Sequence, residues 1–163
     1  MLPLLLLLQV APAVPAASSA VCSGTFVYSA PFAAWTSAKA SNAPVIGAAT
    51  DIAPVPVADA KFVTAPDRAA KPGTGAVVAG FDVPVVGIYR IAVGGAALRP
   101  KGIWIDVVAG GEALKSVAHE EGPACSTIAK VVDFDLPAGH YTLQLAGIPD
   151  PSTPVRVLIL PKG

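Results

Sequence analysis

The two histidines of the chain are the first residues that could carry chemistry. One belongs to the acidic stretch His119-Glu120-Glu121, and the other is His140. Two histidines and one carboxylate form the ligand set of non-haem iron oxygenases, so His119, Glu121 and His140 are a candidate iron site. The stretch lacks the His-Glu-x-x-His spacing that places two zinc ligands on one helix face. The alternative interpretation is a solvated polar loop together with an outward-facing histidine on a strand.

Trp104 and Asp106 form a second candidate site. They alternate with apolar residues between 103 and 107, so on a strand they face away from the core. Arg90 or His140 would lie beside them if those strands are neighbours. An exposed indole among hydrogen-bonding groups can stack on a sugar ring. The alternative is that a proline-rich segment covers this face and that Trp104 packs beneath it.

Other chemistries find little support in the sequence. The chain has no Gly-x-Ser-x-Gly motif and no glycine-rich phosphate loop between a strand and a helix. Asp133 and Asp135 flank Phe134 beside a turn, which favours turn capping or calcium over acid–base catalysis. The 11 basic and 11 acidic residues cancel, so the composition gives no electrostatic reason to expect nucleic-acid binding.

The elements that must position these residues come from an internal repeat. Phe81–Gly94 reads FDVPVVGIYRIAVG, and Phe134–Gly147 reads FDLPAGHYTLQLAG. In both copies apolar residues alternate along the chain, which is the period of a half-buried strand, and the proline and glycine between them predict a turn. We therefore predict two hairpin units, 81–107 and 134–159, that bury their apolar faces against each other.

The predicted fold class is all-β: a jelly-roll-like antiparallel β-sandwich with little helix. Residues 76–163 form its core, and residues 21–75 supply an N-terminal strand and a proline-rich covering segment. The Gly110-Gly111 pair predicts a tight hairpin turn. Strands are expected at 25–29, 61–64, 76–82, 88–93, 103–109, 113–117, 128–135, 140–145 and 155–160.

The N-terminus and the cysteines indicate an exported protein. Leu4–Leu8 is a leucine run followed by small residues, so residues 1–20 are predicted to be a secretory signal peptide. No later apolar run reaches the length of a membrane span. In an oxidising compartment Cys22 and Cys125 are expected to form one disulfide. The alternative for Cys22 is attachment of a lipid.

Two resemblances follow from these motifs. The frame FDLPAGHYTLQLAG resembles bacterial pre-peptidase C-terminal domains, which implies a sandwich fold and an accessory role beside secreted enzymes. The stretches Tyr89–Val93, Trp104–Val108, Gly122–Cys125 and Tyr141–Gln144 are similar to a group of small exported proteobacterial proteins. Some of these carry the label homogentisate 1,2-dioxygenase, which implies an iron site of two histidines and a glutamate.

Taken together, these observations predict an exported, non-catalytic binding or accessory module of the periplasm or cell surface. Its expected partner is a glycan or an envelope protein, without nucleic acid, membrane span or cofactor. The alternative is an iron-dependent dioxygenase built on His119, Glu121 and His140. The second alternative is a purely structural envelope protein, which the lack of an exposed aromatic patch would favour.

Overall fold

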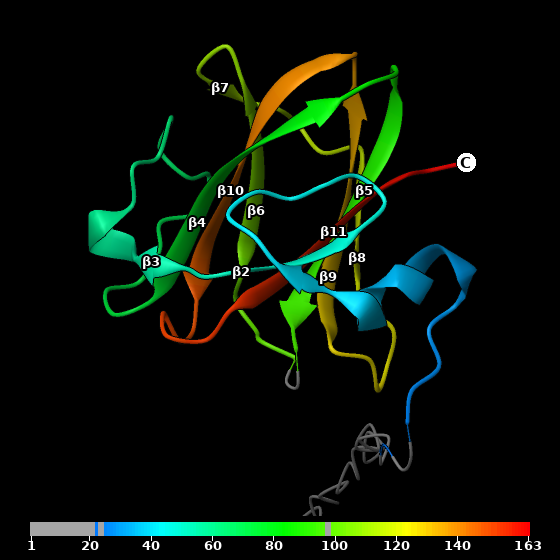
Figure 1. Cartoon of the computed structure of the whole chain (residues 1–163). Coiled ribbons are helices and arrows are strands. Elements are labelled where there is room, and N and C mark those ends of the chain that lie inside the picture. Colours follow the sequence, from blue (N-terminus) through cyan, green and yellow to red (C-terminus); the bar gives the residue numbers. More distant parts are fainter. Residues whose placement is uncertain (1–21, 23–24, 97–98) are drawn as a thin grey trace, which may run out of the picture.

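Two β-sheets pack face to face in the computed structural model (Figure 1), which describes residues 22, 25–96 and 99–163. The six-stranded sheet has the order β1-β2-β11-β5-β9-β8, and the five-stranded sheet has the order β3-β4-β10-β6-β7. The predicted all-β sandwich is therefore confirmed. The predicted signal peptide lies outside the described residues.

The strands of the six-stranded sheet, in chain order, are β1 (Lys39–Ala40), β2 (Ala49–Ile52), β5 (Gly87–Gly95), β8 (Ala118–Glu121), β9 (Ile128–Leu136) and β11 (Val155–Pro161). Those of the five-stranded sheet are β3 (Val55–Pro56), β4 (Gly75–Val83), β6 (Trp104–Ala109), β7 (Glu112–Ala113) and β10 (Gly139–Ile148). Within the described ranges, helical structure consists of two 3₁₀ segments, η1 (Ala30–Ser37) and η2 (Val57–Asp59). The predicted Gly110-Gly111 turn joins β6 to β7, and both glycines have positive φ.

The turns inside the repeat cross from one sheet to the other. β4 and β5 lie in different sheets, and so do β9 and β10. The prediction that each copy forms a hairpin was therefore wrong. Alternation identifies which side chains face inward, but it does not identify the neighbouring strand. Each copy is an arch whose two strands face each other across the core.

The two copies exchange strands in a symmetric way. The central strand β5 lies between β9 and β11 of the second copy, and the central strand β10 lies between β4 and β6 of the first. In this register Phe81 pairs with Tyr141, and Phe134 pairs with Tyr89. These rings belong to one buried cluster between the sheets. The repeat therefore specifies a single shared core rather than two separate units.

Residues 25–64 differ from the strand predictions. Residues 25–29 and 61–64 form no strand, whereas β2 and β3 do, by pairing with β11 and β4. The backbone amides of Val63 and Thr64 hydrogen-bond to the side chain of Gln144, at 2.6 and 3.4 Å, instead of to a strand ladder.

Two predictions between residues 113 and 121 were also wrong. The strand expected at 113–117 is confined to the two-residue β7. The acidic stretch expected as a loop forms β8, an exposed edge strand paired with β9.

Both outer faces of the sandwich carry a covering segment (Figure 1). On the six-stranded sheet, Phe32 and Trp35 of η1 pack against a second apolar cluster that includes Ala92 and Leu158. On the five-stranded sheet, the segment after η2 is tied to β10 through Gln144.

The predicted disulfide between Cys22 and Cys125 is formed, with the Cα atoms 5.3 Å apart. It links the chain before η1 to the loop before β9. In the part of the chain that the structure describes, no helix is long and apolar enough to cross a membrane.

Candidate functional site

The structure does not bring together the three residues predicted to bind iron. His119 and Glu121 lie on β8 at the edge of the six-stranded sheet, whereas His140 lies on β10 of the other sheet. The Nδ1 atom of His140 is 2.8 Å from Oδ1 of Asp82, and Glu121 pairs with Arg99. Among the described residues, no group of three or more His, Cys, Asp or Glu side chains could hold a metal ion. The sequence does not show which strands are neighbours, and the predicted triad depended on that.

The pair predicted around Trp104 is formed, but without two of its expected neighbours. Trp104 Nε1 donates a 3.0 Å hydrogen bond to Oδ1 of Asp106. Arg90 lies on β5 of the other sheet and pairs with Asp133. His140 lies on β10, where its side chain is exposed and pairs with Asp82 instead. Residue 106 is in register with Gln144, so the polar residue beside this pair is one that the sequence analysis did not select.

Asp106 is almost fully buried, with 4% of its surface exposed. Burial raises the pKa of this carboxyl group, and the hydrogen bonds from the Asp67 backbone and from Trp104 oppose that rise. The Asp67 amide lies 3.4 Å from Oδ2. Both carboxylate oxygens therefore have donors inside the protein, which makes Asp106 a residue that positions the indole of Trp104.

The covering segment ends its contact with the sheet close to Trp104. Gln144 Oε1 accepts from the Val63 amide, and Nε2 donates to the Thr64 carbonyl at 3.1 Å. The next contact along the segment is the hydrogen bond from the Asp67 amide to Asp106. The predicted cover is thus present over β10 and β6, but Trp104 itself keeps a partly exposed side chain at the margin of the cover.

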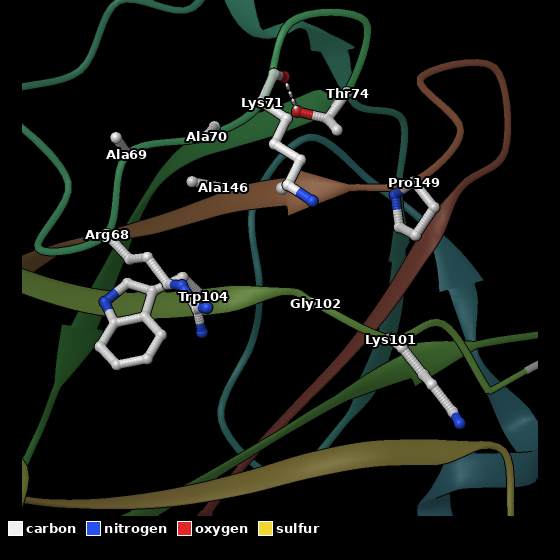
Figure 2. Close-up of a pocket in the computed structure, with 11 residues that line it drawn as sticks. Arg68, Ala69, Ala70, Lys71, Thr74, Lys101, Gly102, Trp104, Ala146 and Pro149 are labelled. Carbon is white, nitrogen blue, oxygen red and sulfur yellow. Dashed lines mark hydrogen bonds between the residues drawn. The ribbon is translucent and has the colours of Figure 1, made fainter.

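Two adjoining cavities open at this margin. One has a volume of about 250 Å³ and is lined by Arg68, Lys71, Thr74, Gly102, Trp104 and Pro149, among others (Figure 2). The other has a volume of about 460 Å³ and is lined by residues that include Arg99, Glu121 and Lys130. They share Arg68, Lys101 and Gly102, so we treat them as one surface and call it the basic groove.

The name reflects the charges along the groove. Five of the eleven Lys and Arg residues of the chain line it, against one acidic residue, Glu121. Arg99 is already bound, because its Nη2 atom contacts Glu121 Oε2 at 3.1 Å and the Gly122 carbonyl at 2.9 Å. The other four form no salt bridge with any described residue; they are Arg68, Lys71, Lys101 and Lys130.

Two of these unpaired cations lie against the indole of Trp104. The Nζ atom of Lys130 is 4.3 Å from the ring centroid, and the Cζ atom of Arg68 is 6.0 Å from it. Figure 2 shows Arg68 reaching from the covering segment across to the ring. Burial lowers the pKa of Lys130, Arg68 adds to this effect, and Glu121 and Asp106 oppose it. Two positively charged side chains, Lys130 and Arg68, therefore lie close to the same ring.

Two glycines shape the groove where β10 leaves the sheet. Gly102 and Gly147 both have positive φ, at 86° and 77°. A Cβ atom on Gly147 would lie 2.7 Å from the carbonyl oxygen of Gly102, so no other residue fits there without movement. The close approach of the two backbones therefore requires glycine at position 147.

The basic groove was not predicted from the sequence. Its cations come from three separate segments, and only the local density of basic residues in the loops at 67–75 and 98–102 gave a signal. Comparison with protein-family models, with curated proteins and with solved structures found no match for this chain. The two resemblances to known families therefore stay predictions.

Proposed function

We propose that this protein is an exported binding module that holds a saccharide in the basic groove. The observation that carries the proposal is the indole of Trp104, fixed by a buried carboxylate at the margin of an open groove. Saccharide sites combine an aromatic ring with several hydrogen-bonding groups in fixed positions. The unpaired side chains of Arg68, Lys71 and Lys101 supply such donors.

The opposite face of the sandwich gives an internal comparison. One offset of 52 residues relates Trp104 to Arg156 and also relates their strand partners, Ala146 and Gly94. Arg156 lies 5.9 Å from the ring of Trp35, which comes from the segment covering that face. The two faces thus carry the same cation–aromatic pair with the roles of strand and cover exchanged.

The two cation–aromatic pairs differ in the burial of the ring and in the pairing of the cation. Trp35 is 1% exposed. Arg156 is held by Asp51 at 2.7 and 2.8 Å and donates to the Trp35 carbonyl at 2.9 Å. The Trp104 pair is more open: Arg68 forms no salt bridge with a described residue, and Trp104 is partly exposed. A structural role accounts for the Arg156–Trp35 pair, because its charge is neutralised and its ring is buried. It does not account for the unpaired charge of Arg68 beside Trp104.

The setting fits a ligand outside the cytoplasm. A disulfide is typical of periplasmic and secreted proteins. Trp104 and Lys130 lie on the strands β6 and β9, whereas Arg68, Lys71 and Lys101 lie in loops beside them. We therefore assign the protein to the periplasm or the cell surface, as an accessory module that presents one glycan-binding face.

The test is a glycan array followed by titration calorimetry of the glycans that bind. Trp104→Ala is expected to lose binding, whereas His140→Ala is the control, because His140 is exposed on the same sheet and does not line the groove. Circular dichroism checks that both variants fold. Retention of full binding by a folded Trp104→Ala variant, or the lack of any bound glycan, would overturn the proposal.

A further inference from the structure

We propose that the saccharide held in the basic groove is acidic, an oligosaccharide that carries carboxylate or sulfate groups on successive sugar units. The inference rests on the proposed function and deepens it by naming the chemical class of the ligand. It is carried by four unpaired cations that the fold gathers along one groove, two of them against the ring of Trp104.

The first step concerns the charges at Trp104. Lys130 and Arg68 approach the same indole from β9 and from the covering segment. Like charges at this range repel, and the repulsion is stronger where burial reduces screening. The two carboxylates that act on Lys130 are Glu121 and Asp106. Glu121 pairs with Arg99, and Asp106 already accepts hydrogen bonds from Trp104 and from the Asp67 amide. A bound carboxylate or sulfate would relieve the repulsion that the protein leaves in place.

The second step concerns the length of the groove. The smaller cavity extends to Lys71 and Thr74, the larger one extends to Arg99 and Lys130, and Arg68 and Lys101 lie at the part that both share. A single small anion would contact only one end. A chain with a charge on each sugar unit would meet a cation at both ends and at the middle. The arrangement therefore favours an extended polyanion over a free ion.

The third step concerns the rest of the molecule. The chain carries no net charge, with 11 basic and 11 acidic residues, so this concentration of positive charge is local. Elsewhere, Arg90, Arg156 and Lys162 form salt bridges, whereas Lys39, Lys61 and Lys115 form none with a described residue. Four of the seven cations without a salt bridge therefore line the groove, and we expect the site to discriminate by charge.

A single-stranded nucleic acid is also an extended polyanion, but its binding sites also offer free aromatic faces on which bases stack. Among the described residues, Trp104 is the only aromatic side chain that lines the groove, so successive bases would find one ring and not a series of rings. The groove therefore fits charged sugars better than bases, and nucleic acid is an outcome that the experiment must exclude.

The experiment is calorimetric titration of the full exported chain with five probes at about 50 and 300 mM NaCl. The probes are an oligogalacturonate, a heparin-derived oligosaccharide, a neutral malto-oligosaccharide, inorganic sulfate and single-stranded DNA. We expect at least one acidic oligosaccharide to bind more tightly than the neutral one and to weaken with salt. The first two probes distinguish carboxylate from sulfate groups, and either result supports the inference.

Two double variants carry the same change of charge. Arg68→Gln with Lys101→Gln removes cations from the shared part of the groove and is expected to weaken the acidic ligand roughly tenfold or more. Lys39→Gln with Lys115→Gln removes exposed cations that do not line the groove and is expected to change the affinity less than about twofold. Equal losses in both double variants would overturn the inference.

The remaining outcomes separate the two proposals. Equal affinity for neutral and acidic oligosaccharides would overturn the inference and leave the proposed function standing. Inorganic sulfate or DNA binding as tightly as the acidic oligosaccharides would also overturn the inference. A lack of binding to every oligosaccharide, together with an empty glycan array, would overturn both.

Discussion

Tyr89 and Tyr141 make the same hydrogen bond in the two copies of the repeat. Each hydroxyl donates at 2.8 Å to the carbonyl oxygen four residues earlier, that of Val85 in the first copy and that of Pro137 in the second. Each bond therefore ties the second strand of the crossing, β5 or β10, to the turn before it. The strands that follow enter opposite sheets, so this bond helps to hold the chain at the points where it changes sheet.

Replacing either tyrosine by phenylalanine should destabilise the fold by a similar amount. Each change removes one partly buried hydrogen bond and keeps the ring, so we expect the free energy of unfolding to fall by about 1 kcal/mol in each variant. Urea unfolding of Tyr89→Phe, Tyr141→Phe and the double variant measures this. A loss in only one of the two single variants would contradict the equivalence of the copies.

The sequence predicted most of the strands because alternation is a local signal. β4, β5, β9, β10 and β11 each fall within three residues of their expected ends. The partners of the strands are not local, so the crossing of the repeat between sheets could not be predicted. Short strands such as β2 and β3 form only because β11 and β4 offer free edges, and their own residues carry no clear pattern.

Only the part of the candidate site that lies on a single strand could be predicted from the sequence. Trp104 and Asp106 are two residues apart, so their common face followed from the period of a strand. Lys130 and Arg68 reach the same ring from distant parts of the chain. The iron hypothesis failed for the same reason, since His140 and His119 lie in different sheets.

Asp133 should be the most important carboxylate for stability. It is 3% exposed and accepts hydrogen bonds from Arg90 at 3.0 Å and from Lys162 at 2.7 Å. Burial alone would raise its pKa, but these two bonds outweigh burial and hold the pKa below its ordinary value. Its contribution to stability is therefore present above about pH 4 and is lost as the pH falls through the lower pKa of the folded state.

We expect Asp133→Asn to lower the free energy of unfolding by about 2 to 3 kcal/mol at pH 7, because it leaves a buried charge pair incomplete. The deficit should shrink as the solution is acidified, since the wild-type carboxylate becomes protonated. Denaturant unfolding between pH 7 and pH 3 measures both effects. Asp135→Asn is the matched control, an exposed position on the same strand, and a loss of equal size there would contradict the assignment.

Asp106 should show the opposite dependence on pH. Its pKa is raised in the folded protein, mainly by burial, so folding favours the protonated form. Its favourable contribution is complete below about pH 4 and is lost as the pH rises through the raised pKa. Asp106→Asn cannot ionise, so its stability relative to the wild type should increase between pH 4 and pH 7. A constant difference across that range in urea unfolding would contradict this account.

Gly147 and Gly102 allow a test of the close approach at the groove. Both have positive φ, so alanine at either position should cost about 1 to 2 kcal/mol. A Cβ atom at position 147 would also lie 2.7 Å from the Gly102 carbonyl oxygen, whereas one at position 102 meets no atom within 4 Å. We expect Gly147→Ala to be clearly the less stable variant by thermal unfolding. Equal losses would show that φ alone decides the cost.

The disulfide should stabilise the fold because it closes a long loop in the unfolded chain. Cys22 and Cys125 are 103 residues apart in the sequence, and closing a loop of this size is worth up to about 4.7 kcal/mol in the chain-entropy account. We expect the Cys22→Ala/Cys125→Ala variant to lose about 3 kcal/mol of unfolding free energy. Reduction of the wild type should give a loss of similar size, measured by denaturant unfolding with and without reductant.

Cys125 adds a second effect, because its φ of 66° is in the left-handed region. Alanine there keeps this strain, whereas glycine adopts the conformation freely. The Cys22→Ala/Cys125→Gly variant should therefore be about 1 kcal/mol more stable than Cys22→Ala/Cys125→Ala, although neither has the cross-link. The reverse order would mean that the loop before β9 relaxes to another backbone conformation once the disulfide is removed.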